Sequence, residues 1–242
     1  MNNFVKFDNS LTFHNGGIEA LKWIALASMI LDHVNKYLFN YSIDYFFEIG
    51  RLAMPLFGII FAYNMARDKS KGSQYYIKVF KRLTTYGLIA TPYFTILGGV
   101  KYGWWPLNIL FTFAISTLLM YWLSSETSKI IKTVIFIVTF AIGGAIVEFW
   151  WPALTLIISS WAFFRYRNML FYIGIALGFF GLCYINGNYF ALLSIPLFIS
   201  IASIDIRIPR MKRVFYYTYA AQFPIYFLIR IPMENNGYIF LI

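Results

Sequence analysis

Charged residues are scarce in this 242-residue sequence: Asp, Glu, Lys and Arg make up 12% of it, whereas soluble domains carry about 25%. Hydrophobic residues reach 60% and aromatic residues 21%. A chain with so little polar surface cannot cover a water-soluble core. This excludes a soluble Rossmann or barrel enzyme, a nucleic-acid-binding module and a disordered tail. The composition predicts a polytopic membrane protein.

Cysteine and histidine are also rare. The single cysteine, Cys183, lies in an apolar stretch, so no intrachain disulfide or Cys-rich metal site is possible. The two histidines, His14 and His33, are far apart in the sequence, and we expect no metal site. The sequence contains no P-loop, Gly-rich nucleotide fingerprint, HExxH motif or serine nucleophile elbow. Residues 1–17 are polar and lack the apolar core of a signal peptide.

Long apolar runs predict an all-α transmembrane helix bundle of about nine or ten spans, since a helix needs about 20 mostly apolar residues to cross a bilayer. The candidate spans are residues 18–39, 46–66, 75–97, 105–123, 130–147, 151–164, 170–184, 189–204 and 214–231. Residues 1–17 then form a polar N-terminal tail, and residues 18–242 form a single transmembrane domain without repeats or linkers. Glycine pairs at 98–99 and 143–144 predict a close helix approach or a break.

Basic residues alternate between the connections and predict the orientation. The even-numbered connections are flanked by Arg67, Lys69, Lys71, Lys78, Lys81 and Arg82, by Lys129 and Lys132, by Arg165 and Arg167, and by Arg207, Arg210, Lys212 and Arg213. The odd-numbered connections hold little beyond Asp44 and Lys101. This positive-inside pattern, which accounts for the net charge of +10, predicts a cytoplasmic N-terminus.

Polar residues inside the predicted spans or directly at their ends form the candidate site. An ionisable residue in a bilayer costs about 2.5–3.5 kcal/mol and persists where it pairs, meets water or takes part in chemistry. In the predicted orientation such residues fall at one level in the outer half of the membrane. They are Asp32, His33, Glu48, Arg51, Asn108, Glu148, Tyr226 and Arg230. Glu48 and Arg51 share a helix face, and Pro55 follows Arg51 by four residues.

Two interpretations of these residues stay open. Arg51 cannot lose its proton and needs a carboxylate, a phosphate or water, and the candidate carboxylates are Glu48, Asp32 and Glu148. In a structural interpretation, Arg51 and Glu48 lock two helices, and Glu148 belongs to an interfacial aromatic belt. In a chemical interpretation, His33 is a general base oriented by a nearby carboxylate, and Arg51 stabilises an oxyanion or holds phosphates.

Two stretches near the start of the chain carry a distinctive pair of motifs. Residues 21–33 (LKWIALASMILDH) form a lysine-led helix that ends in Asp-His, and residues 49–57 (IGRLAMPLF) contain Gly-Arg-x-x-x-Pro-x-Phe. Together they resemble the opening signature of the TraX family. Residues 107–112 (LNILFT) are similar to its Asn-x-x-x-Thr stretch, and Glu148 begins its acidic–aromatic pair. Two positions depart from the pattern. Tyr226 stands where the last helix usually carries a histidine, and Trp150 stands where a glycine is expected.

The resemblance implies a bacterial inner-membrane acetyltransferase, related to other integral-membrane acyltransferases, that uses acetyl-CoA to acetylate the N-terminal amine of pilin. We expect catalysis by His33 and Asp32, and donor or acceptor binding by Arg51, Glu48, Asn108, Glu148 and Tyr226. The expected partners are membrane lipids and an acyl acceptor from the periplasmic side, with no metal and no nucleic acid. Two alternatives stay open: O-acylation of an envelope sugar or lipid, and a non-enzymatic proton-coupled transporter or channel.

Overall fold

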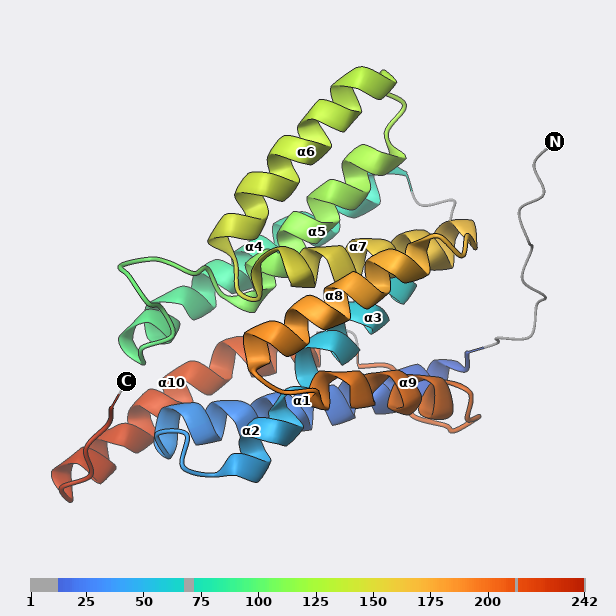
Figure 1. The fold of residues 1–242 in the computed structure, drawn as a ribbon. Coiled ribbons are helices and arrows are strands. Elements are labelled where there is room, and N and C mark those ends of the chain that lie inside the picture. Colours follow the sequence, from blue (N-terminus) through green and yellow to red (C-terminus); the bar gives the residue numbers. More distant parts are fainter. Residues whose placement is uncertain (1–12, 68–71, 212, 242) are drawn as a thin grey trace.

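The computed structural model describes residues 13–67, 72–211 and 213–241 (Figure 1). Its helices are α1 (Asn15–Leu38), α2 (Asp44–Gly50), α3 (Ala53–Ala66), α4 (Ser73–Ile96), α5 (Ile109–Ser124), α6 (Lys129–Ile146), α7 (Trp150–Tyr166), α8 (Phe171–Asn186), the 3₁₀ turn η1 (Phe190–Leu193), α9 (Ser194–Ala202) and α10 (Val214–Asn235). In these ranges the chain forms isolated β-bridges but no strand, so the predicted all-α fold is confirmed. Most of the predicted tail, and Lys69, Lys71 and Lys212, lie outside the described residues.

Each predicted span coincides with one helix or with two consecutive helices of the described ranges. In those ranges, α2–α3 and α6 are long and apolar enough to cross a membrane, and α5, α8 and η1–α9 are shorter apolar helices. The most exposed of the long apolar helices is α6, on which Ile130, Ile137 and Ile142 are all exposed. Such a helix is typical of contact with lipid.

The span predicted at 46–66 is two helices, broken at Arg51 and Leu52. Pro55 has no N–H and cannot bond the carbonyl of Arg51 four residues earlier. The chain there forms tighter turns, in which the amide of Arg51 donates to the carbonyl of Glu48 (3.1 Å) and the amide of Leu52 donates to the carbonyl of Ile49 (3.1 Å). Arg51 therefore lies at a bend between α2 and α3.

Both predicted consequences of the glycine pairs are confirmed. A Cβ on Gly143 would lie 2.5 Å from Cγ2 of Ile115, and a Cβ on Gly144 would lie 2.2 Å from Cδ1 of Trp151. These glycines therefore allow α6 to pack closely against α5 and α7. The other pair ends α4, where Gly98 has a φ of +81°, a conformation that glycine adopts without strain.

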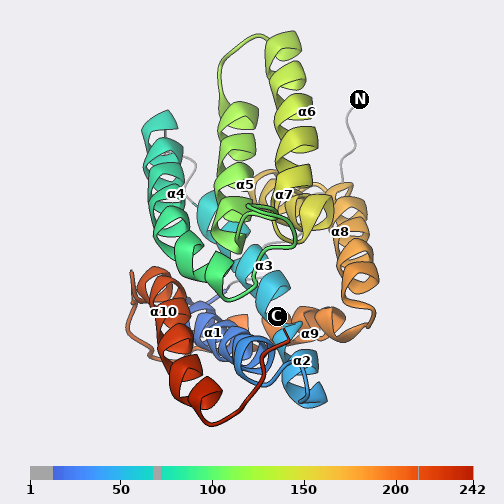
Figure 2. The same cartoon turned by 90° about the vertical axis from the view of Figure 1, so that its left-hand side faces the viewer.

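The helix ends nearest the candidate residues lie at one end of the bundle. In Figure 1 the connections 97–108 and 147–149 and the C-terminus lie toward the left, and the connections 125–128 and 167–170 lie toward the right. Figure 2, seen from that left-hand end, shows α1 between α10 and α2. Helix α1 packs against both of them and against α3 and α9, while α4 contacts α5 and α10. Residues distant in the sequence therefore meet at this end.

Candidate active site

An ion pair between Asp32 and Arg51 joins α1 to the bend between α2 and α3. Nη2 of Arg51 donates to Oδ1 of Asp32, Nη1 donates to Oδ1 of Asn186 (3.2 Å), and Nε donates to the carbonyl of Phe47 (3.1 Å). The Arg51 and Asp32 side chains are only 12% and 18% exposed. A guanidinium bonded through all three nitrogens has a fixed orientation. Of the carboxylates that the sequence offered to Arg51, Asp32 is the partner.

Gly50 makes this pairing possible. A Cβ at Gly50 would lie 2.5 Å from Cβ of Asp32, so only glycine lets α2 approach α1 this closely. Glu48, two residues earlier on α2, is half-buried. The pairing of Glu48 with Arg51 does not form, because the guanidinium is turned toward Asp32 on α1.

His33 faces the neighbouring helix α10. Its Nδ1 lies 3.0 Å from Oε1 of Gln222. The ring packs among Tyr37, Tyr219 and Phe223, with centroid distances of 5.6, 6.3 and 5.6 Å. The His33 ring is therefore held between α1 and α10.

Tyr226 lies one turn after Gln222 on α10. Its hydroxyl donates to Oε1 of Gln222 (3.4 Å), and its ring stacks on Tyr37 with a centroid distance of 6.1 Å. Tyr226 is thus connected to His33 through the glutamine. Arg230, another turn on, donates through Nε to the carbonyl of Tyr37 (2.8 Å).

A short backbone ladder positions Glu148, which lies in the connection between α6 and α7, outside both helices. Its amide donates to the carbonyl of Leu107 (3.0 Å), and its carbonyl accepts from Oγ1 of Thr112 (3.0 Å). These bonds tie the connection to the start of α5. The side chain is consequently held near the N-terminus of that helix, where the amide of Ile109 acts on the carboxylate.

The Glu148 carboxyl group lies within range of the other charges of the site. Lys36 and Arg51 attract its negative charge, and Asp32 repels it. The largest influence is burial, which raises the pKa of Glu148 from its ordinary 4.5 to about 7 although Lys36 opposes the shift. The structure therefore brings Glu148 into one cluster with Asp32 and Arg51, and Lys36 belongs to it as well.

The residues after Glu148 show why a glycine suits this turn. Phe149 and Trp150 have φ of +58° and +47°, in the left-handed region, which costs a non-glycine residue about 1–2 kcal/mol. Trp150 is the position at which the TraX resemblance predicts glycine. Its ring stacks on Trp105 at 6.1 Å and lies 5.5 Å from Nζ of Lys101, and these contacts offset part of the cost.

Asn108 has a structural task at the start of α5. Its Oδ1 accepts from the amide of Leu110 (3.2 Å), which makes it the N-cap. Its Nδ2 donates to the carbonyl of Gly87 (2.9 Å) and to Oγ1 of Thr91 (3.1 Å). The side chain, with the residue only 1% exposed, is fully occupied in joining α4 to α5. It supports the site by fixing where α5 begins.

Two polar neighbours in the site, Gln222 and Asn186, were not found from the sequence. Both are neutral amides, so a search for charges in apolar segments passes over them. The available signal was an amide at position 222 in an apolar helix, one turn before Tyr226.

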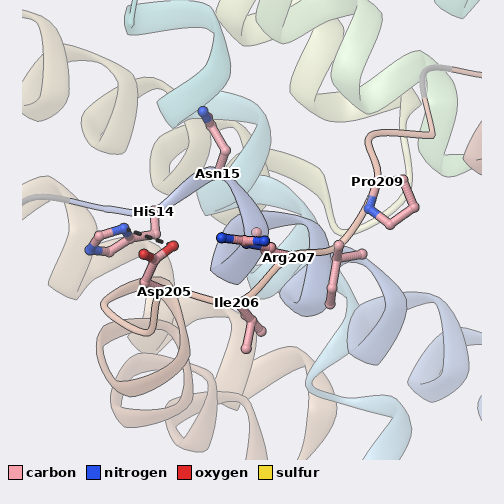
Figure 3. Close-up of a pocket in the computed structure, with 8 residues that line it drawn as sticks. His14, Asn15, Asp205, Ile206, Arg207 and Pro209 are labelled. Carbon is pink, nitrogen blue, oxygen red and sulfur yellow. Dashed lines mark ion pairs between the residues drawn. The ribbon is translucent and has the colours of Figure 1, made fainter.

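A cavity of about 560 Å³ opens at the other end of the bundle, where α1 begins. It is lined by His14, Asn15, Gly16, Asp205, Ile206, Arg207, Ile208 and Pro209. Figure 3 shows His14 and Asp205 directed toward one another, with Nδ1 and Oδ1 3.5 Å apart. In the described part of the chain, no group of three or more His, Cys, Asp or Glu side chains could hold a metal ion.

Comparison with known proteins assigns the family. The family model described as "TraX protein" matches residues 17–230, which include every residue of the site. The chain belongs to the TraX family. Two curated relatives, both called Protein TraX, come from Escherichia coli and from its strain K12, and they are 30% and 28% identical over 134 residues.

Each of these matches covers 55% of this chain and 50% of the relative, so the chain spans about half the length of the curated TraX relatives it matches. No solved structure matches the chain. The TraX resemblance seen in the sequence is confirmed, and with it a helical membrane protein.

Proposed function

We propose that this TraX-family protein is an integral-membrane acetyltransferase that moves an acetyl group from acetyl-CoA to the N-terminal amine of a pilin. The observation that carries the proposal is the position of His33. Its Nδ1 is held by α10, while Nε2 has no hydrogen-bond partner among the described residues, and the Asp32–Arg51 pair lies alongside. TraX-family membership supports the same reaction class.

In the proposed reaction the neutral amine attacks the thioester carbonyl, a C–N bond forms, and the carbonyl oxygen becomes an oxyanion. Nε2 of His33 takes the proton from the attacking nitrogen. When the carbonyl re-forms, the C–S bond breaks and the CoA thiolate takes that proton from His33. The products are an acetylated amine and free CoA thiol. A general base of this kind contributes about 10²–10⁴-fold to the rate.

Arg51 stabilises the oxyanion or holds the donor's phosphates in this proposal. A guanidinium has five N–H groups, and the bonds to Asp32, Asn186 and Phe47 use three of them. The remaining N–H groups keep a fixed direction because the ion pair with Asp32 holds the side chain. A single pre-positioned donor of this kind is worth about 10²–10³-fold in kcat.

We infer the predicted orientation, with the N-terminus in the cytoplasm of a bacterium and the site in the outer half of the inner membrane. Acetyl-CoA then approaches from the opposite end of the bundle, which carries the basic connections, and its thioester reaches through the helices. The acceptor arrives from the periplasmic side, and lipid covers exposed helices such as α6. The same residues would also acylate a hydroxyl of an envelope sugar or lipid, so the acceptor requires its own test.

The decisive experiment compares acetyl transfer by the purified protein and by its His33→Ala variant, with acetyl-CoA and a peptide that carries a pilin N-terminus. We expect the variant to lose transfer while its helix content and unfolding transition persist. His14→Ala, at the opposite end of the bundle, is the matched control and should retain transfer. Undiminished transfer by a folded His33→Ala protein would remove the proposed base. Mass spectrometry of envelope proteins and glycans from cells with and without the protein identifies the acceptor.

A further inference from the structure

We propose that Gln222 is the positioning residue for His33: its side-chain oxygen accepts the Nδ1 hydrogen and fixes the imidazole tautomer whose Nε2 carries the lone pair. The catalytic consequence rests on the proposed function. The tautomer itself can be measured on a protein that shows no activity.

The backbone carbonyl of Tyr219 determines how the Gln222 amide is oriented. Nε2 of Gln222 donates to the carbonyl of Tyr219 (3.2 Å), and its Oε1 accepts from the hydroxyl of Tyr226 (3.4 Å). If the amide group were rotated by 180°, Oε1 of Gln222 would face the carbonyl oxygen of Tyr219, and the two would repel each other. Because Gln222 is only 4% exposed, water cannot readily relieve that repulsion. The observed orientation therefore presents Oε1 to His33.

The oxygen of Gln222 dictates which ring nitrogen carries the hydrogen. Oε1 can only accept, and it lies 3.0 Å from Nδ1 of His33, so Nδ1 must be the donor. A neutral imidazole has one N–H, which leaves Nε2 without hydrogen. The aromatic rings of Tyr37 and Phe223, each with its centroid 5.6 Å from the ring, restrict rotation away from this bond.

This arrangement corrects our expectation that a carboxylate orients His33. Asp32, the adjacent carboxylate, is committed to Arg51 on another helix face, since consecutive helical residues point about 100° apart. A neutral amide holds the imidazole without adding a further charge to an apolar environment. The base is thus oriented from α10, while the charged pair lies between α1 and α2–α3.

The tautomer is directly measurable because the chain has only two histidines. In a His14→Gln protein labelled with ¹⁵N-histidine, all imidazole signals come from His33. At a pH where the ring is neutral, we expect Nδ1 to give the signal of a protonated nitrogen and Nε2 that of an unprotonated nitrogen. The reverse assignment would overturn the proposal, and this measurement requires no substitution at Gln222.

Two substitutions of similar length separate positioning from packing. Gln222→Met keeps the volume and removes the acceptor, so it should populate the Nε2–H tautomer and lower kcat/KM by about 10- to 100-fold. Gln222→Glu keeps an acceptor oxygen in either protonation state and should preserve the Nδ1–H tautomer and most of the activity. A Gln222→Met protein that retains the Nδ1–H tautomer would refute the role of Gln222. Transfer by His33→Ala, in contrast, would refute the proposed function alone.

Discussion

Replacing Glu148 with glutamine tests whether this carboxyl group is as poorly solvated as the structure indicates. The side chain lies in the connection between α6 and α7, and burial raises its pKa from 4.5 to about 7. Glutamine has nearly the same shape and keeps an oxygen that can accept from the amide of Ile109. The substitution therefore removes the charge and little else.

The magnitude follows from the pKa. A carboxyl group with a higher pKa in the folded protein binds more protons when folded, so its stabilising contribution is present below about pH 4.5 and is lost as the pH rises through about 7. One pKa unit corresponds to about 1.4 kcal/mol. As the pH rises from about 4.5 to above 7, the free energy of unfolding of the wild type therefore falls by about 3 kcal/mol relative to that of a protein with a neutral residue at this position.

The assay is unfolding of the detergent-solubilised protein at about pH 5 and at about pH 8. Between these two conditions we expect the free energy of unfolding of Glu148→Gln to gain about 2.5 kcal/mol over that of the wild type. The matched control is Glu126→Gln, since Glu126 is exposed in the connection between α5 and α6, and this variant should follow the wild type. If the free energy of unfolding changed with pH to the same extent in the wild type and in Glu148→Gln, the reasoning would be refuted.

Two further predictions concern the ion pair. Gly50→Ala places a Cβ 2.5 Å from Cβ of Asp32 and should lower the free energy of unfolding by about 1–3 kcal/mol; an unchanged unfolding transition would contradict this close approach. Arg51→Lys keeps the charge but cannot bond Asp32, Asn186 and a backbone carbonyl together, so single-turnover acetyl transfer should fall about 10²-fold. A variant that folds and transfers at the wild-type rate would exclude Arg51 as the clamp.

The helices were predictable because apolar length is a local property of the chain. The ends of the helices were less predictable, because individual residues determine where each helix begins and ends. Residues 105–108 precede α5, which begins only after the Asn108 cap, and the span at 46–66 is interrupted because Pro55 cannot bond the carbonyl of Arg51. Single residues, Asn108 and Pro55, set these two boundaries, so the length of an apolar run does not predict them.

The sequence by itself determined the helical membrane class, the TraX family and the charged residues of the site, because composition, span length and short motifs are read along the chain. Tertiary structure alone decided the pairing: Arg51 with Asp32 rather than Glu48, and His33 with Gln222 rather than a carboxylate. Helical spacing tells which side chains share a face. It does not tell which face of another helix they meet, because packing between distant segments sets that.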